Sequence, residues 1–440
     1  MAIRLKSVPL RRSQGPGRND ALMLTGNGKG MDGDGRHHQN QRTDWFCAQK
    51  ESAAVSRFMT GGRYQLAWAA ATMPLTTPLT GGLVGYGPAG RIHSVISPRN
   101  RVKRRRLDCP RDAFRSMTVL VTGAAGFIGY HLTEALAARG ERVVGFDNVN
   151  DYYDVRLKQA RLERLGRHKS FRFEKGDIAT PGAIAALLKK DGVDRVVHLA
   201  AQAGVRYSLT NPQAYIEANL IGHFNVIEAC RHHAGLKHLV YASSSSVYGG
   251  NKRLPFSVDD KVDQPVSLYA ATKAADELMS HCYSHLYRIP ATGLRFFTVY
   301  GPWGRPDMSA YIFTKAILEG KPIKVFNHGD MMRDFTFVDD IVAGVVAALD
   351  HPPADGGTVP HRRYNLGNHR AEELLRFIQL IERATNRKAV LEFEDMQPGD
   401  VKETYADIEA AQRDLGFHPR TTIDDGIPKF VDWFRKYHGV

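Results

Sequence analysis

Tyr269 and Lys273 lie four residues apart in a segment, YAATK, that we predict to be helical. This spacing places the two side chains on one face of the helix. A nearby ammonium favours the phenolate form of a tyrosine, so Tyr269 could act as a base near neutral pH. Taken alone, this spacing is more often that of a solvated helix face, so its interpretation depends on the residues that accompany it.

Four consecutive serines, residues 243–246, precede Val247 at the end of a predicted strand. In a parallel sheet the carboxyl end of a strand lies at the edge where ligands bind. A serine hydroxyl at that edge could contact a ligand next to Tyr269 and Lys273. The combination of hydroxyl, phenol and ammonium is much more specific than any of its parts and indicates acid–base chemistry.

The stretch TVLVTGAAGFIG, residues 118–129, predicts a strand, a glycine-rich turn and the start of a helix. Gly123, Gly126 and Gly129 have the spacing GxxGxxG. Such glycines permit a tight turn, let backbone amides approach a pyrophosphate and allow close packing of helix and strand. A glycine triplet by itself could also be a structural turn.

Asp147 ends the second predicted strand, about 20 residues after the glycines. A carboxylate at this position accepts hydrogen bonds from the adenosine ribose and repels a 2′-phosphate, which favours NAD over NADP. The alternative is that Asp147 only begins the loop 148–154. Asp177, at the end of the third predicted strand, could line the adenine pocket or cap a turn.

The elements that must position these residues alternate in type from Met117 onward. Apolar runs typical of buried strands alternate with helix-length segments, which is the pattern of a parallel sheet covered on both faces. The predicted strands are residues 118–122, 142–146, 171–174, 195–200, 238–242 and 292–297. We therefore predict an α/β fold with a doubly wound parallel sheet of the Rossmann type.

A chain of 440 residues exceeds the size at which one core keeps growing, so we expect more than one part. We assign residues 1–116 to a basic extension, 117–300 to the sheet with its catalytic residues, and 301–440 mainly to a smaller, mixed substrate-binding lobe. Helix candidates in the last part are residues 310–319, 341–349, 372–385 and 427–437.

Most of the net charge of +14 belongs to the N-terminal extension. Through Ser116 the chain has 20 Lys and Arg against 7 Asp and Glu, whereas the rest of the chain is nearly balanced at +1. Weak periodicity and many Gly, Arg, Ser and Pro residues predict that the extension is disordered. Its basic cluster, residues 101–106, lacks aromatic or amphipathic patterning, so we expect neither a nucleic-acid nor a membrane partner.

The four cysteines, Cys47, Cys109, Cys230 and Cys282, form no CxxC pair. This spacing argues against a zinc site and against a disulfide framework. We therefore expect no metal and a reducing, cytoplasmic location. No run reaches the roughly 18 apolar residues that a membrane span requires.

From Met117 to the C-terminus, the chain resembles the extended short-chain dehydrogenase/reductases, nucleotide-sugar enzymes with this glycine pattern and a Ser/Thr, Tyr, Lys triad. The resemblance implies that Tyr269 is the acid and base and that Lys273 holds the nicotinamide ribose. It implies that Ser244 bonds the reacting hydroxyl, because the family's Ser or Thr stands three residues before the Val of VYG. Asn219 matches a recurrent asparagine near this site, or is a buried polar group of a helix.

The cofactor implied by the motif and the resemblance together is NAD. The residues expected to contact it are Gly123, Gly126, Phe127, Ile128, Gly129, Asp147, Asn148, Asp177, Ile178, Leu199, Ala200, Ala201, Asn219, Tyr269 and Lys273.

The two residues after Ser244 indicate the type of reaction. Dehydratases that resemble this chain carry an Asp-Glu pair there, and uridine-sugar decarboxylases keep the Glu, because both reactions need further proton-transfer groups. Ser245 and Ser246 replace these acids. The resemblance therefore implies epimerisation at C4, in which oxidation to a 4-keto sugar is followed by reduction from its other face.

Three further blocks resemble the signatures of UDP-glucuronate 4-epimerases: DNVNDYYDV at 147–155, AQAGVRYS at 201–208 and YGPWGRPDM at 300–308. This resemblance implies a UDP-sugar substrate whose C6 carboxylate is held by hydroxyls and a cation. The expected substrate contacts are Arg206, Ser245, Ser246, Thr298, Arg305, Arg333 and Asp400.

Three of these substrate contacts have alternatives. Arg206 could face solvent, as most arginines do. Arg333 resembles the arginine that clamps the diphosphate, or it forms a surface ion pair with Asp334. Asp400 matches a residue that bonds the uridine ribose, or it caps a turn.

The leading hypothesis is thus a cytoplasmic, homodimeric UDP-glucuronate 4-epimerase. A UDP-glucose or related UDP-hexose 4-epimerase and a non-catalytic NAD-binding protein of the same fold are the alternatives. Family members begin within a few residues of the first strand, so we expect the residues before Met117 to be dispensable. A translation start placed too far upstream would explain them, and a basic anchoring arm is the other explanation.

Overall fold

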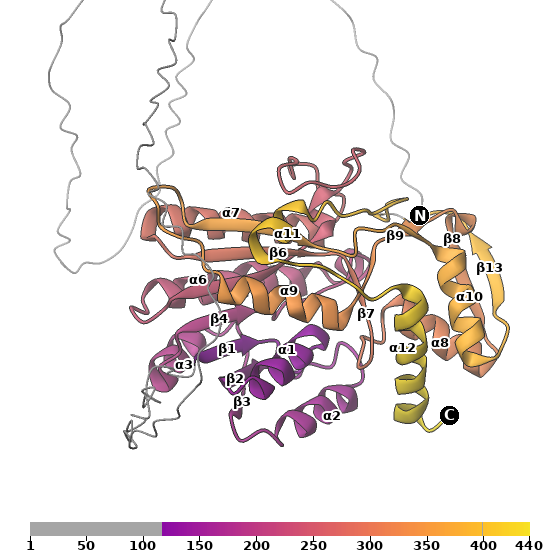
Figure 1. The fold of residues 1–440 in the computed structure, drawn as a ribbon, viewed down its shortest axis with the longest axis horizontal. Coiled ribbons are helices and arrows are strands. Elements are labelled where there is room, and N and C mark those ends of the chain that lie inside the picture. Colours follow the sequence, from indigo (N-terminus) through magenta and orange to yellow (C-terminus); the bar gives the residue numbers. More distant parts are fainter. Residues whose placement is uncertain (1–116, 398) are drawn as a thin grey trace, which may run out of the picture. The chain divides into compact units, whose positions relative to one another are not determined.

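The computed structural model describes residues 117–397 and 399–440 (Figure 1). The expectations for residues 1–116, including the basic cluster and two of the cysteines, lie outside the described residues. Within the described ranges, no helix has both the length and the apolar character needed to cross a membrane.

A parallel sheet of seven strands forms the centre of the described residues, in the order β11-β6-β5-β4-β1-β2-β3. All neighbouring pairs run parallel. The strands are β1 (Thr118–Thr122), β2 (Arg142–Asp147), β3 (Phe171–Lys175), β4 (Arg195–His198), β5 (His238–Ser244), β6 (Ala291–Phe296) and β11 (His361–Leu366). The predicted doubly wound sheet is confirmed.

Helices cover both faces of the sheet (Figure 1). Side chains alternate across β1: Val119 and Val121 pack into one core cluster, which includes residues of α1 and α9, and Leu120 packs into another, which includes residues of α3 and α6. Burial on both faces explains why the middle of the strand, residues 119–121, is continuously apolar. The helices of the sheet are α1 (Phe127–Ala138), α2 (Val155–Leu165), α3 (Ala183–Asp191), α6 (Gly222–Arg231), α7 (Leu268–Tyr287) and α9 (Val338–Asp350).

Shorter elements build the smaller lobe and the connections. The lobe contains α8 (Ser309–Glu319), β8 (Pro322–Phe326), β9 (Met332–Arg333), β12 (Glu372–Glu373), α10 (Leu374–Thr385), β13 (Val390–Glu394) and α12 (Ile423–His438). The connections include β7 (Thr298–Tyr300), β10 (Phe335–Phe337), α4 (Tyr207–Thr210), α5 (Pro212–Tyr215) and α11 (Glu409–Leu415). One π-helical turn spans Ile216–Ile221, and 3₁₀ turns span Ser245–Tyr248 and Asn327–Gly329.

Strand β11 is the element of the sheet that the sequence did not predict. It begins with His361, Arg362 and Arg363 and therefore lacks a continuous apolar run. Its pairing with β6 brings part of segment 301–440 back into the sheet. The boundary at 300/301 stays a prediction, and the chain crosses between sheet and lobe more than once.

Three helix starts differ from the prediction by more than one residue. α9 begins at Val338, three residues before the predicted start. Glu372 and Glu373 pair with β9 instead of beginning α10. α12 begins four residues early, at Ile423, because the side chain of Thr422 accepts a hydrogen bond from the amide of Asp425 and caps the helix.

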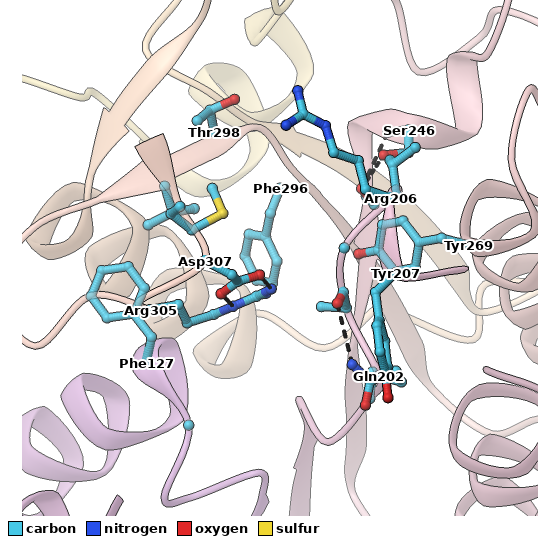
Figure 2. A pocket seen from close by; sticks show the side chains of 18 of the residues that line it. Phe127, Gln202, Arg206, Tyr207, Ser246, Tyr269, Phe296, Thr298, Arg305 and Asp307 are labelled. Carbon is cyan, nitrogen blue, oxygen red and sulfur yellow. Dashed lines mark hydrogen bonds and ion pairs between the residues drawn. The ribbon is translucent and has the colours of Figure 1, made fainter. Parts of the chain in front are cut away.

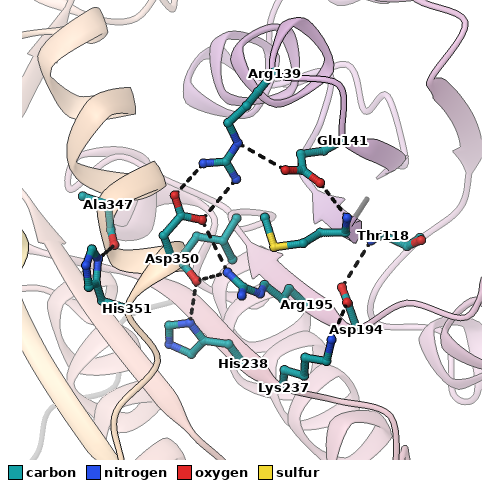
Figure 3. Close-up of polar contacts among 12 residues, drawn as sticks. Thr118, Arg139, Glu141, Asp194, Arg195, Lys237, His238, Ala347, Asp350 and His351 are labelled. Carbon is teal, nitrogen blue, oxygen red and sulfur yellow. Dashed lines mark hydrogen bonds and ion pairs between the residues drawn. The ribbon is translucent and has the colours of Figure 1, made fainter. Parts of the chain in front are cut away.

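The carboxyl ends and the amino ends of the strands have different roles. The carboxyl ends of the strands border a large cavity (Figure 2). At the amino ends of the strands, polar side chains hold the start of β1 and the end of α9 in place (Figure 3). Asp350 accepts hydrogen bonds from Arg139, with an Nη1–Oδ2 distance of 2.5 Å, and lies 3.4 Å from Arg195. The amide of Met117 donates to Glu141 at 2.7 Å, and that of Thr118 donates to Asp194 at 3.2 Å.

We predict that a chain beginning at Met117 keeps the melting temperature and the bound NAD of the full chain. Glu141 would then pair with the new terminal ammonium, a charge-assisted contact in place of the present amide contact. Calorimetry and the cofactor content of both purified proteins test this. A large loss of either property on truncation would contradict it.

Candidate active site

A cavity of about 1220 Å³ lies where the strand ends of the sheet meet the smaller lobe. Its wall includes the glycine turn after β1, the ends of β2, β4 and β5, the start of α7, and residues of β7, β8 and β9. All the site residues predicted from the sequence line this cavity, with the exception of Asn219.

The glycine turn makes close main-chain contacts that leave no room for side chains. Gly123 has φ +74°, and a Cβ there would lie 2.8 Å from the amide nitrogen of Ala200. A Cβ on Gly129 would lie 2.0 Å from the carbonyl oxygen of Gly123. α1 starts after Gly126, whose position has no side-chain cap, so the first amides of this helix have no side-chain acceptor there. Since residues 126–129 line the cavity, this helix end is suited to a pyrophosphate.

The carboxylates predicted to bind the adenosine end adjoin the glycine turn. Asp147 is buried and accepts hydrogen bonds from the amides of Ala125, at 3.1 Å, and Val149, at 2.8 Å. Asp177 accepts from the amide of Ala179 and from the side-chain amide of Asn148, both at 2.8 Å. Asp177 therefore stabilises a turn and lines the cavity at the same time, and both of its predicted roles fit its position.

Asn219 lies on the π-helical turn and is 1% exposed. Its side chain accepts from the amide of Gln202 at 2.9 Å and donates to Gln202 O and Thr272 Oγ1 at 3.1 and 3.0 Å. The structure does not bring it to the cavity wall. Asn219 thus corresponds to the alternative prediction, a buried polar group of a helix. Its hydrogen bonds position Gln202, which does line the cavity.

The predicted triad comes together from β5 and α7. Ser267 caps α7 by accepting from the amide of Ala270 at 3.1 Å, so the helix begins just before Tyr269. Ser244 ends β5, and its Oγ lies 3.1 Å from both the amide and the Oγ of Ser246. Ser244, Tyr269 and Lys273 all line the cavity.

Lys273 is part of the cavity wall and is almost fully buried. Its Nζ donates to the carbonyl oxygen of Ala242 at 3.1 Å and to Asp276 Oδ2 at 3.0 Å. Asp276 is 0% exposed. Burial raises the pKa of Asp276 to about 6, against the opposing effect of Lys273. Asp276 carries no assignment from the sequence, although it lies one helical turn after Lys273.

A second buried ion pair supports the serine turn from behind. Glu277 receives two hydrogen bonds from Arg295, at 2.8 and 2.7 Å, and one from Ser243 Oγ at 2.6 Å. Arg295 also donates to the hydroxyl of Tyr248 at 2.9 Å. Both ends of the segment 243–248 are thus attached to one ion pair. The only sequence signal for this pair is an arginine inside the apolar strand 292–297.

Arg206, Asp400 and Arg333 form a charged cluster at the lobe side of the cavity. Arg206 is exposed, lies 3.0 Å from Asp400 and stacks 4.4 Å from the ring centre of Phe326. Arg333 donates to the carbonyls of Met332 and Lys402 at 2.9 Å each, and burial lowers its pKa. The predicted alternative of a surface pair between Arg333 and Asp334 is wrong.

Asp334 is instead fully buried and forms hydrogen bonds with the main chain. Its carboxylate accepts hydrogen bonds from the amides of Asn368, His369 and Ala406. Arg206 is exposed, as its alternative prediction of a solvent-facing residue requires, but it also lines the cavity.

Arg305 and Asp307 lie across the cavity from Tyr269 (Figure 2). Arg305 binds Asp307 at 3.0 and 2.5 Å, and the hydroxyl of Tyr152 donates to Asp307 at 3.1 Å. Burial and the charge of Asp307 raise the pKa of Tyr152 to about 12, so this phenol stays neutral. Asp307 and Tyr152 occur in the sequence blocks quoted above, but those blocks alone did not indicate that the two residues meet.

Comparisons with known proteins show which family the chain resembles. Residues 119–367 match the NAD dependent epimerase/dehydratase family. An uncharacterized 37.6 kDa protein of Escherichia coli O111:H- is 52% identical over 336 residues, which cover 74% of this chain and 100% of that protein. UDP-glucuronate 4-epimerase 4 of Arabidopsis thaliana is 48% identical over 333 residues, 73% of this chain and 76% of the relative.

A solved structure is also similar. The UDP-glucuronic acid 4-epimerase of Bacillus cereus, in complex with UDP-glucuronic acid and NAD, has a TM-score of 0.68 at 36% identity, covering 73% of this chain and 100% of that one. With more than half of its residues matched by the family model and with relatives at these identities, the chain belongs to the NAD dependent epimerase/dehydratase family.

Proposed function

We propose that this chain is an NAD-dependent epimerase that converts UDP-glucuronate to UDP-galacturonate through a transient 4-keto sugar. The observation that carries the proposal is the cavity itself. It joins the glycine turn, the Ser244, Tyr269 and Lys273 set, and a hydroxyl-rich turn in one space. A volume of about 1220 Å³ exceeds that of ordinary ligand pockets and suits a dinucleotide together with a nucleotide sugar.

The residues present fit NAD. The uncapped start of α1 and the side-chain-free turn at Gly123 would hold the pyrophosphate. Asp147 would bind the adenosine ribose, and Lys273 the nicotinamide ribose. When bound, NAD supplies the acceptor and donor for the hydrogen of C4.

The protein side chains handle the proton and the orientation. Tyr269 takes the proton of the C4 hydroxyl and returns it to the 4-keto oxygen after the sugar has turned over. Ser244, whose hydroxyl bonds Ser246 in this structure, bonds the same sugar oxygen. The charge of Lys273 stabilises the phenolate. The hydrogen and its electron pair return to C4, so no second substrate is consumed.

Ser245, Ser246 and Thr298 would bind the C6 carboxylate, since all three line the same cavity as the triad. Hydroxyl donors form strong, charge-assisted bonds with a carboxylate. Because the guanidinium of Arg206 already pairs with Asp400, these hydroxyls are better candidates than Arg206 for this role. Arg333 would bind the diphosphate and Asp400 the uridine ribose.

We propose that two copies of the chain form a homodimer through α6 and α7, which contact each other. Leu278 and Leu286 are 71% and 58% exposed and lie two helical turns apart on α7. On α6, Phe224 is 46% exposed. Several large apolar side chains exposed on two helices that contact each other are typical of a surface that a partner covers.

A cytoplasmic location is also part of the proposal. Within the described residues, Cys230 and Cys282 are both free, which suits a reducing compartment.

Replacing Tyr269 with Phe should lower turnover about 10²- to 10⁴-fold and leave NAD binding intact, because only the titrating hydroxyl is removed. Epimer formation by chromatography and cofactor absorbance measure the two effects. Tyr364→Phe is the matched control, since this phenol bonds Asp414 away from the cavity. Near-normal turnover in Tyr269→Phe would exclude this residue as the acid and base.

UDP-glucuronate should be preferred over UDP-glucose by orders of magnitude in kcat/KM, because donors left without their carboxylate are costly. Ser245→Ala and Thr298→Val should each reduce kcat/KM for UDP-glucuronate roughly ten- to a hundred-fold and change that for UDP-glucose much less. Ser246 is unsuitable for this test because its hydroxyl bonds Ser244. Equal efficiency of the unmodified enzyme on both sugars would favour a UDP-hexose 4-epimerase.

Light scattering coupled to size-exclusion chromatography should report a dimer for the unmodified chain and a monomer for Leu278→Arg. An arginine in the centre of an apolar interface leaves a charge buried without a partner. Val390→Arg, at an exposed apolar position on β13, should remain dimeric. A monomeric unmodified chain would disprove the assembly.

A further inference from the structure

Asp276 is a buried acid on α7, the helix that carries Tyr269 and Lys273, and it does not line the cavity. Its Oδ2 lies 3.0 Å from the ammonium of Lys273, one helical turn earlier. Its Oδ1 is buried without a hydrogen-bond partner among the described residues. A buried carboxylate in this state is costly, and its charge is compensated chiefly by Lys273.

The other titratable groups around this pair contribute little net charge. On α6 the ring of His223 contacts α7 through Ser280, at 3.0 Å, and on β4 the ring of His198 lies 5.3 Å from that of His223. Burial lowers the pKa of His223 to about 3 and that of His198 well below its usual value, so both rings are neutral. On β5, burial raises the pKa of Tyr241 well above its usual value, so this phenol is neutral as well.

The remaining neighbour is Glu277, also on α7. Its charge is matched by the two hydrogen bonds from Arg295, and by Arg363 at 3.4 Å. Lys273 and Asp276 therefore chiefly balance each other's charge.

We propose that Asp276 is a positioning residue, the counter-ion that holds the Lys273 ammonium in place and sets the pH range in which Tyr269 exchanges its proton. This rests on the roles of Tyr269 and Lys273 in the proposed function. Asp276 acts through Lys273, since the carboxylate itself is excluded from the cavity. With two of its three N–H groups bound to Ala242 and Asp276, the ammonium keeps one N–H for a ligand.

The sign of the effect follows from the charge. Removing a negative charge near Tyr269 and Lys273 favours the deprotonated form of both. Both limbs of the pH profile should then move to lower pH. A purely structural role would reduce the height of the profile without moving it.

The first test is the pH dependence of kcat/KM for Asp276→Asn, an isosteric change that keeps an oxygen acceptor for Lys273. We expect the profile to move to lower pH by about half a unit to one unit. Asp194→Asn is the control, because it removes the same charge at the amino ends of the strands, where Asp194 binds Lys237. This control should not move the profile. An unmoved profile in Asp276→Asn would overturn the proposal.

The second test is independent of sugar turnover. Melting temperatures are measured for Asp276→Asn in the unmodified chain and in a Lys273→Met background. Asp276→Asn should lower the melting temperature when Lys273 is present and leave it unchanged or raise it when Lys273 is Met, because the isolated carboxylate is then itself the unpaired charge. Equal changes in both backgrounds would refute a counter-ion role. If the unmodified enzyme shows no sugar turnover but the effect of Asp276→Asn on the melting temperature still depends on Lys273, the result counts against the proposed function alone.

Discussion

The close approach of main chains around Gly123 is the constraint on which the rest of the site depends. The turn after β1 passes so near to β4 and to Gly129 of α1 that a single Cβ at either glycine would collide with backbone atoms. This proximity aims the start of α1 at the cavity and places Asp147 within reach of the Ala125 amide. Because the strands are parallel, β4 and β5 end on the same side of the sheet as β1. The serine turn after β5 therefore lines the same cavity as the start of α1.

Ionic groups behind the cavity wall have a different role from those inside it. Arg295 and Glu277 are both buried, and such a pair gains little stability after the cost of removing two charges from water. Their geometry is nevertheless specific, since a bidentate pair has one preferred orientation. Ser243 and Tyr248 both bond to this pair, so it defines the conformation of the turn that carries Ser244. The neighbouring pair of Lys273 and Asp276 is buried as well, but it has a single contact, and the second carboxylate oxygen of Asp276 has no hydrogen-bond partner among the described residues.

The sequence allowed the fold to be predicted wherever local patterns determine structure. Among the described residues, apolar runs identified six of the seven strands of the central sheet, and β11 was missed because its polar start has no such pattern. The glycine turn and the set of Ser244, Tyr269 and Lys273 were recognisable because their residue types and spacing are local. Partners far apart in the chain were not. Asp400 lies 194 residues after Arg206, and no spacing rule connects them. The buried position of Asn219 also depends on a tertiary contact, its bonds to Gln202.

Asn365 on β11 connects the order of synthesis to the assembly of the site. Its side chain accepts from the hydroxyl of Tyr248 at 2.6 Å and donates to the carbonyls of Phe256 and Asp407. The turn that carries the catalytic serine is therefore completed by a residue that leaves the ribosome more than a hundred positions later. Contacts of such long sequence separation form late in folding. A nascent chain that has completed its glycine turn and α7 can already form most of the central sheet. The turn that carries Ser244 is completed only when β11, the last strand of that sheet, has been synthesised.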